Sequence, residues 1–172
     1  MIYLISDTHF NHKNIIKYAN RPFDTIEKMN EAMIKKWNKT VSNKDTIYHL
    51  GDFAFGNKEQ IIEIVGRLNG RKILIKGNHC KKSSKWYIEC GFDVALDCGV
   101  ILDEYYLLTH RPIEDISDPY YNISGHTHLI NSKNSRVYNV SVEQINYTPI
   151  LLDKVKKILE VREKILENIF TV

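Results

Sequence analysis

The sequence predicts a single α/β domain, in which short buried strands alternate with amphipathic helices. Its length of 172 residues is the usual size of one domain. In the first half, apolar runs of strand length alternate with longer segments whose apolar residues recur at helical spacing. Short motifs rich in histidine and aspartate follow several of these runs, and no repeat, low-complexity tract or linker divides the chain. We therefore expect residues 1–172 to form one domain.

Strands and helices can be placed from this alternation and from their capping residues. In the first half we expect strands at 2–6, 46–50 and 71–76, a helix capped by Asp24 or Thr25 with the apolar stripe Ile26, Met29, Met33 and Trp37, a helix over 57–65 closed by Gly66, and a short helix ending at Trp86. In the second half we expect strands at 93–96, 100–102, 105–109, 121–124 and 136–142, and a C-terminal helix at about 151–170 with the apolar positions Leu152, Val155, Leu159, Leu166 and Ile169. The stripe of this last helix is expected to pack on the domain, with a dimer face as the alternative.

The composition is that of a soluble enzyme-sized domain. A hydrophobic fraction of 43% can supply a core, and the formal net charge of +3 suits an acidic or phosphorylated substrate without demanding nucleic acid. The N-terminal apolar run is too short for a signal peptide or a membrane span. The three cysteines Cys80, Cys90 and Cys98 form no disulfide framework, and Cys90 and Cys98 are expected to be small core residues. We expect a cytoplasmic protein.

Five motifs contain five of the seven histidines, and they occur in order along the chain. They are Asp7-Thr-His9, Gly51-Asp52, Gly77-Asn78-His79, Thr109-His110 and Gly125-His126-Thr127-His128. Four of them begin where an apolar strand is expected to end. Since sites in layered α/β folds gather beyond the carboxyl ends of strands, we expect these side chains to converge.

The spacing of the donors indicates a site for two cations. In an extended chain, residues two apart point the same way, so Asp7 and His9 can reach one ion. His126 and His128 repeat this spacing, and they can share one ion or be divided between two. Imidazole with carboxylate favours Zn, Fe, Mn or Ni over calcium.

Charge and geometry give the central residues separate tasks. A carboxylate such as Asp52 can bridge two cations, and Asn78 offers a neutral oxygen. Two divalent ions bring four positive charges and the two aspartates return two negative ones, so the site can attract a phosphate. Ions roughly 3.5–4 Å apart lower the pKa of a bridging water and clamp an in-line displacement. His79, next to Asn78, is then placed beside the substrate, where it can protonate the leaving alkoxide or stabilise the charge of the transition state.

In this order and spacing, the motifs between Asp7 and His128 resemble the calcineurin-like metallophosphoesterases. The resemblance implies a four-layer α/β/β/α sandwich with a dimetal site at the strand ends and His79 as general acid. It implies a first cation held by Asp7, His9, Asp52 and His128, and a second held by Asp52, Asn78, His110 and His126. Segments 6–10, 49–53 and 76–79 are similar to small stand-alone phosphoesterases of bacteria and phages.

One position departs from the family pattern, and three residues outside the five motifs have expected roles. Cys80 takes the place of the usual Asp or Glu after Gly-Asn-His, which puts the rate in doubt more than the reaction. His12 and Lys81 are candidate substrate-binding residues, although His12 is at least as well explained by a helix-start role and Lys81 by a solvated surface. His49 is expected to pack under the site or to orient Asp52.

The expected function is dimetal phosphoester hydrolysis, with phosphodiesters favoured. The expected partner is a small phosphate ester, nucleic acid is possible, and no membrane is expected. The alternatives are a phosphomonoesterase or nuclease of the same family, a protein phosphatase, or a non-catalytic protein-binding scaffold. The scaffold is disfavoured because every ligand position is present.

Overall fold

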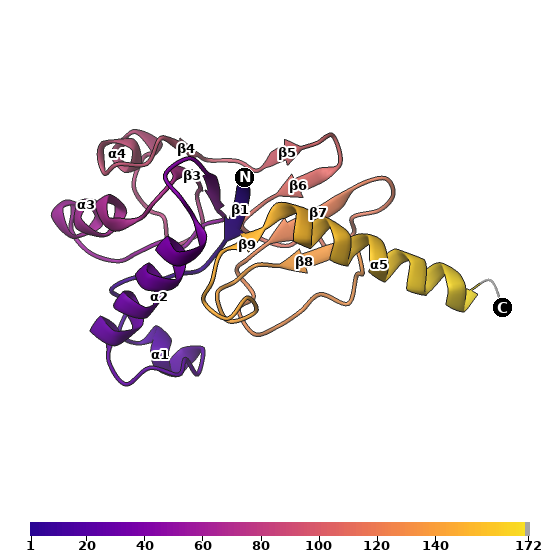
Figure 1. Ribbon diagram of the computed structural model, residues 1–172, viewed down its shortest axis with the longest axis horizontal. Coiled ribbons are helices and arrows are strands. Elements are labelled where there is room, and N and C mark those ends of the chain that lie inside the picture. The colour runs from indigo at the N-terminus through magenta and orange to yellow at the C-terminus, as the bar shows by residue number, and fades with distance from the viewer. Residues whose placement is uncertain (171–172) are drawn as a thin grey trace.

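The computed structural model describes residues 1–170, except for the side chains of Glu167, Ile169 and Phe170, so the predicted apolar position Ile169 lies outside the described side chains. The described residues contain nine strands and five helices (Figure 1), which include every element placed from the sequence together with a strand at 150–151 and a helix at 15–18 whose ranges were not predicted. The strands are β1 (Ile2–Ile5), β2 (Thr46–His49), β3 (Arg71–Ile75), β4 (Val94–Leu96), β5 (Val100–Leu102), β6 (Tyr106–Leu108), β7 (Tyr121–Ser124), β8 (Val137–Asn139) and β9 (Ile150–Leu151). The helices are α1 (Ile15–Tyr18), α2 (Ile26–Thr40), α3 (Lys58–Arg67), α4 (Ser84–Glu89) and α5 (Leu152–Phe170).

The strands form two sheets that meet near the start of the chain. The first sheet has the order β4-β3-β2-β1-β9, and the second has the order β5-β6-β7-β8. Within them β1 to β4 are parallel, and so are β6 to β8, while β9 and β5 are antiparallel edge strands. A parallel bridge between Ser6 and Ser141 joins the ends of β1 and β8. The carboxyl ends of both parallel sets are thereby brought to one edge.

Alternation along the first sheet divides the core into two clusters. Tyr3 and Ile5 point to one side, where they pack with the buried residues of α2, α3 and α4. Leu4 points to the other side, where it packs with Leu108 and Ile123 of the second sheet and with the buried residues of α5. The mixed α/β fold with two sheets and flanking helices is therefore confirmed.

The opposite face of the second sheet is covered by loops. Asn122 accepts a hydrogen bond from the backbone of Ile113 (2.9 Å) and donates to Thr109 Oγ1 (2.9 Å). Asn134 donates to the carbonyls of Glu114 and Ile116 (2.8 and 2.9 Å). These bonds hold the segment after His110 against the sheet.

Local signals explain most helix boundaries, but two expectations about helix ends and one about a strand end were wrong. Thr25 is the N-cap of α2, since its side chain accepts from the backbone of Lys28. Gly66 does not end α3, which continues to Arg67, and Gly70 with φ +89° supplies the turn instead. α4 runs on beyond Trp86 to Glu89. β8 ends at Asn139 because the chain then crosses to pair with Ser6.

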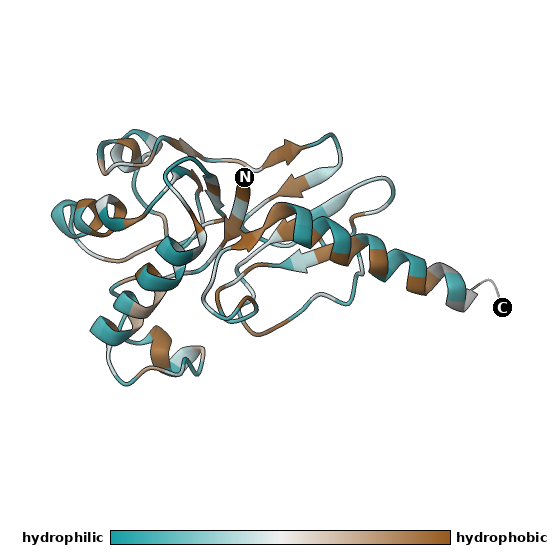
Figure 2. Ribbon diagram, viewed as in Figure 1, coloured by the Kyte–Doolittle hydropathy of each residue, from teal (hydrophilic) through white to brown (hydrophobic). Residues whose placement is uncertain are grey.

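Among the described side chains, the apolar residues of the C-terminal helix are buried only in its first half, although Arg162 and Glu163 still contact Val137 and Tyr121 of the second sheet. Leu152, Val155 and Leu159 are buried, whereas the predicted core position Leu166 is 37% exposed. Figure 1 shows α5 extending past the ends of the strands, and Figure 2 shows apolar and polar segments alternating along it. Within residues 1–170 no helix combines the length and the apolar character needed to cross a bilayer.

Candidate metal centre

The predicted motifs meet at the common carboxyl edge of the two sheets. Asp7, Asp52 and Asn78 follow β1, β2 and β3, and His110 and His126 follow β6 and β7. The structure thus brings residues 119 positions apart into contact, since the backbone N–H of His126 donates to Asp7 Oδ2 (2.8 Å). The predicted convergence of these side chains is observed.

The side chains form two adjacent groups. Asp7, His9 and His128 make one group, which we call the deep cluster, and Asp52, His110 and His126 make the other, which we call the open cluster. In each, one donor atom from every residue lies within 4.8 Å of the others. His126 and His128 are therefore divided between the groups, which settles how these two side chains point.

Asp52, a member of the open cluster, also faces the deep cluster. Its Oδ2 atom is 3.4 Å from His110 Nε2 and 3.8 Å from His9 Nε2. Asn78 joins the open cluster through its Oδ1 atom, which is 2.9 Å from His110 Nε2. One carboxylate is thus within reach of both groups, the arrangement that a bridging ligand requires.

The backbone at these positions differs from the extended chain that the sequence suggested. Asp7, His9, Asp52, His126 and His128 all have left-handed φ values, of 57°, 47°, 54°, 69° and 47°. Such values are uncommon outside glycine, and strain of this kind gathers at functional sites. Asp7 and His9 do share a cluster, but tight turns bring them together.

Two glycines leave room for the clusters. A Cβ on Gly51, which has φ +99°, would lie 2.5 Å from His110 Nδ1. A Cβ on Gly125 would collide with Ser6 Oγ and Asp7 Oδ2. The glycines of these motifs are therefore required by close approach of the backbone to the site.

The deep cluster contains donor atoms that no described residue satisfies. Asp7 Oδ1 and both ring nitrogens of His9 are buried and have no hydrogen-bond partner among the described residues. His9 Nε2 and His128 Nε2 lie 3.9 and 4.0 Å from Asp7 Oδ1. Burial raises the pKa of Asp7, although His110 and His128 oppose the shift, and burial lowers the pKa of His9 to about 2. A buried carboxyl group beside the unsatisfied ring nitrogens of His9 fits a cation, whose positive charge would favour the ionised form of Asp7.

A buried ion pair supports the deep cluster, and the sequence motifs do not include it. Arg21 donates to the carbonyls of Thr8 (2.8 Å) and Asp7 (2.7 Å). Arg21 is also paired with Glu143 at 2.7 Å, and Glu143 Oε1 is 3.0 Å from His128 Nδ1. The two side chains are 0% and 2% exposed. Arg21 therefore holds the strained turn, and Glu143 orients a histidine, as carboxylates behind metal-binding histidines do.

The open cluster rests on backbone groups. His110 Nδ1 donates to the carbonyl of Leu50 (2.8 Å), which leaves Nε2 facing Asp52 and Asn78. Burial acts to raise the pKa of Asp52, but the contact with His110 and the backbone N–H of His79 outweigh burial and hold that pKa at about 2. Burial acts to lower the pKa of His110, but the contact with Asp52 outweighs it and raises that pKa. The carboxylate is thus kept ionised.

His79 is exposed beside the clusters and belongs to a group of rings. Its ring centroid lies 5.5 Å from that of His9 and 5.5 Å from that of Phe55. His12 stacks on Phe55 at 4.3 Å. No hydrogen bond among the described residues joins the His79 side chain to either cluster. This is consistent with the predicted separation of His79 from the metal ligands.

Four other predicted residues have clear positions. Cys80 is buried in the core beside Tyr87, and burial raises the pKa of its thiol. Lys81 is exposed and lines none of the cavities described below. His49 is buried and lies 2.9 Å from Thr8 Oγ1, so it packs under the site. Cys98 is exposed, which corrects its predicted core position, because it lies in the turn between β4 and β5.

Two cavities flank the centre. The first, which we call the side cavity, has a volume of about 480 Å³ and is lined by His9, His12, Ile15, Tyr18, Ala19, His79, Thr127, His128, Leu129 and Ile130. The second, which we call the basic cavity, has a volume of about 410 Å³ and lies beside Asn78 and His110. Its lining includes Lys76, Asp97 and Arg111.

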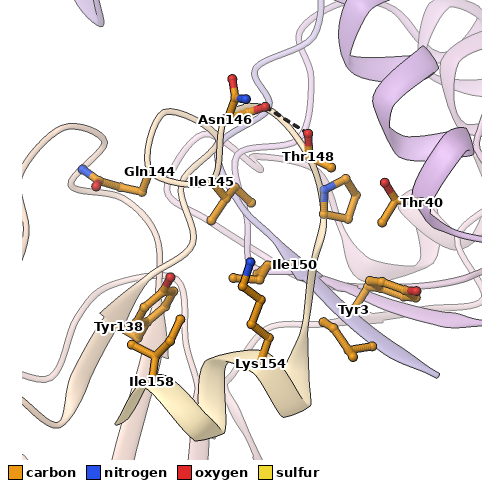
Figure 3. Close-up of a pocket in the computed structure, with 12 residues that line it drawn as sticks. Tyr3, Thr40, Tyr138, Gln144, Ile145, Asn146, Thr148, Ile150, Lys154 and Ile158 are labelled. Atoms are coloured by element: carbon orange, nitrogen blue, oxygen red, sulfur yellow. Dashed lines mark hydrogen bonds between the residues drawn. The ribbon is translucent and has the colours of Figure 1, made fainter. Parts of the chain in front are cut away.

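A third cavity of about 490 Å³ lies away from the clusters, between Tyr3, Tyr138 and the start of α5 (Figure 3). Thr148 donates to the carbonyl of Asn146 (3.0 Å) along one wall, as Figure 3 shows. Gln144 connects this wall with the carbonyl of His128 (2.9 Å). No described residue lining it is a histidine or an acid, so it offers no comparable set of donors.

The comparisons with known proteins agree with this geometry. The chain is 40% identical to the uncharacterized protein MJ1445 of Methanocaldococcus jannaschii, over 92% of this chain and 91% of the relative. It is similar to the crystal structure of AQ665, a protein of unknown function from Aquifex aeolicus, with a TM-score of 0.72, 30% identity, and coverage of 91% of this chain and 98% of the other.

A more distant likeness shows the fold alone. The crystal structure of the Pseudomonas putida nuclease MPE has a TM-score of 0.52 and 18% identity, over 74% of this chain and 61% of that one.

The family profile of the calcineurin-like phosphoesterases matches residues 1–167, nearly the whole chain. The protein therefore belongs to the calcineurin-like phosphoesterase family of metal-dependent phosphoester hydrolases.

Proposed function

We propose that the protein hydrolyses phosphodiesters at a centre of two divalent cations, with His79 as the general acid. The observation that carries the proposal is the position of Asp52, whose carboxylate lies within 4 Å of histidines from both clusters. The unsatisfied donor atoms of Asp7 and His9 support it, because buried polar atoms without partners are rare in proteins.

Each cluster offers one cation a set of oxygen and nitrogen donors. We assign Asp7, His9, His128 and Asp52 to one cation, and Asp52, Asn78, His110 and His126 to the other. Neutral imidazole with carboxylate suits Mn, Fe, Ni or Zn. Bound there, two such cations supply positive charge for the phosphoryl oxygens and acidify a coordinated water.

The chain's own side chains have distinct roles in the reaction. His110 and His128 keep their Nε2 atoms directed at the carboxylates through bonds made by their Nδ1 atoms. Water adds to phosphorus and releases one proton to solvent as the P–O bond to the leaving alcohol breaks, and the electron pair of that bond stays on the leaving oxygen. His79 donates a proton to that oxygen.

Phosphodiesters are favoured because the centre lies between two cavities. A diester carries one substituent on each side of its phosphorus, and the side cavity and the basic cavity offer room for both. A monoester would occupy only one of them. Small phosphate esters and nucleic-acid ends both meet this requirement.

The test is a screen of aryl phosphodiesters and phosphomonoesters with Mn, Ni, Co and Zn added in turn. We expect turnover of the diesters with at least one metal, together with two bound ions per chain by elemental analysis. The Asp52→Asn protein serves as the blank. Complete inactivity with every metal, in a protein that binds two ions, would refute the assignment.

A further inference from the structure

The side cavity combines apolar walls with a position next to the reacting groups. Ile15 and Ala19 of the segment around α1 are buried beneath it. Its rim is formed by Tyr18, Leu129 and Ile130, which are 74%, 56% and 71% exposed. Large apolar side chains that are exposed singly need no explanation, but several around one cavity mark a binding surface.

Rings contribute to the same cavity. His12 stacks on Phe55 at 4.3 Å, and its ring meets that of Tyr18 edge-on at 6.3 Å. Ring faces and edges of this kind favour a planar guest, since aromatic pairs gain energy beyond the area they bury. The volume of about 480 Å³ lies within the range of about 300–1,000 Å³ typical of small-molecule sites.

The side cavity differs from the basic cavity in charge. Among the described residues that line the side cavity, none is a lysine, arginine, aspartate or glutamate. The basic cavity is lined by Lys76 and Arg111, and Lys76 is paired with Asp97 at 2.6 Å. An anionic substituent is therefore better placed on the basic side.

His79 decides which part of a substrate enters the side cavity. His79 lines this cavity and does not line the basic one. If His79 protonates the leaving oxygen, the group attached to that oxygen lies in the cavity that His79 lines. The leaving alcohol, and not the retained substituent, is then the apolar part of the substrate.

We infer that the side cavity binds the leaving group of the substrate and selects an uncharged aromatic alcohol, with Tyr18, Leu129 and Ile130 as specificity-determining residues. This inference rests on the proposed function, because it assumes that hydrolysis occurs at the clusters. The cleaved bond joins phosphorus to the aryl oxygen, which leaves with a proton from His79, while water supplies the new oxygen on phosphorus.

The test compares two leaving groups of similar size and acidity that differ in charge. The substrates are methyl para-chlorophenyl phosphate and methyl para-sulfophenyl phosphate. We expect the kcat/KM of the natural protein to be about tenfold or more higher for the chlorophenyl ester. This is the discrimination that a small difference in apolar contact with a hydrophobic pocket usually gives. In the double variant Leu129→Ser with Ile130→Ser, this preference should shrink to a few-fold, mainly through a higher KM for the chlorophenyl ester.

The control and the contrary outcomes are separable. Ile62→Ser, on α3, removes another exposed apolar side chain (43%) that lines neither the side cavity nor the basic cavity, and it should leave the preference unchanged. Equal hydrolysis of both esters, or an unchanged preference in the double variant, would overturn this inference alone. Hydrolysis of neither ester would overturn the proposed function together with it.

A second measurement needs no turnover. In saturation-transfer NMR, para-chlorophenol should receive magnetisation from the natural protein and from Ile62→Ser, and should receive much less from the double variant. The signal of para-sulfophenol should be weak with all three proteins. A para-chlorophenol signal that is the same in all three would contradict a site formed by Leu129 and Ile130.

Discussion

The deep cluster and the open cluster offer similar donors in different surroundings. The deep cluster is enclosed: Asp7 and His9 are 0% and 2% exposed, and the buried pair of Arg21 and Glu143 lies behind them. Each cluster has one partly buried histidine, His128 in the deep cluster and His126 in the open one, but Asp52 and His110 are slightly more exposed, at 3% and 6%, and the open cluster depends on the backbone carbonyl of Leu50 instead of a buried ion pair. A cation in the deep cluster should therefore exchange more slowly than one in the open cluster.

The two clusters are therefore supported by different parts of the chain. The enclosed side depends on long-range contacts that only the complete fold supplies, since Glu143 comes from the segment after β8 and Arg21 from the segment after α1. The open side is formed by residues directly after the strands. Substitutions can therefore affect both clusters, neither cluster, or one of them.

Asp52→Asn should have the largest effect, because Asp52 contacts both clusters. We expect a fall in turnover of more than about thousandfold, since metal ions contribute several kcal/mol to such reactions. Elemental analysis should find the metal content reduced from two ions to one or fewer. A variant that keeps two ions and near-normal turnover would show that Asp52 does not bridge.

His79→Ala should slow the reaction without emptying either cluster. We expect turnover to fall by about a hundredfold or more, the usual worth of general acid–base catalysis. Metal content should stay at that of the unsubstituted protein, because His79 belongs to neither donor set. Loss of metal in this variant would instead place His79 among the ligands.

Arg21→Met should weaken the deep cluster alone, because it leaves the Glu143 carboxylate buried without the guanidinium group that pairs with it. Removing one partner of a buried ion pair costs about 3–5 kcal/mol, which denaturant unfolding can measure. The affinity of the more tightly held metal should fall by about 10–100-fold, as when outer contacts of a metal site are lost.

The matched control is Arg67→Met, because Arg67 is 39% exposed and pairs with Glu31 at 2.6 Å on the surface. An exposed pair of this kind contributes about 0–1 kcal/mol. If both variants lost the same stability, the burial of Arg21 would have no special role.

Much of the site could be predicted from the sequence because its donors lie in short motifs at strand ends. Strand ends are local features, and apolar runs such as 46–50 and 71–76 mark them well. The division of His126 and His128 between clusters could not be derived, because it depends on left-handed turns that spacing does not encode.

Arg21 and Glu143 were missed for a different reason. Each stands alone among surface-type residues in the sequence, and their pairing joins positions 122 apart. The sequence nevertheless offered one signal for Arg21. It lies between the short helix α1 and Pro22, in a segment with few other residues that would fix the backbone conformation. The length of α5 was predicted correctly, but its burial was not, since the pattern of apolar residues continues after the sheets end.

The smallest expected effect is a difference in the rates at which the three cysteines react with iodoacetamide. These rates also report how tightly the loop beside the open cluster is closed. Cys98 is exposed, whereas Cys80 and Cys90 are buried, and burial raises the pKa of both of these thiols. The thiolate is the reactive form, so a raised pKa means that less of it is present near neutral pH. Iodoacetamide should modify Cys98 first at pH values near neutrality, as followed by mass spectrometry of peptides. Cys80, next to His79, should react at a comparable rate only after unfolding, and early modification of Cys80 in the folded protein would show that residues 77–80 open readily.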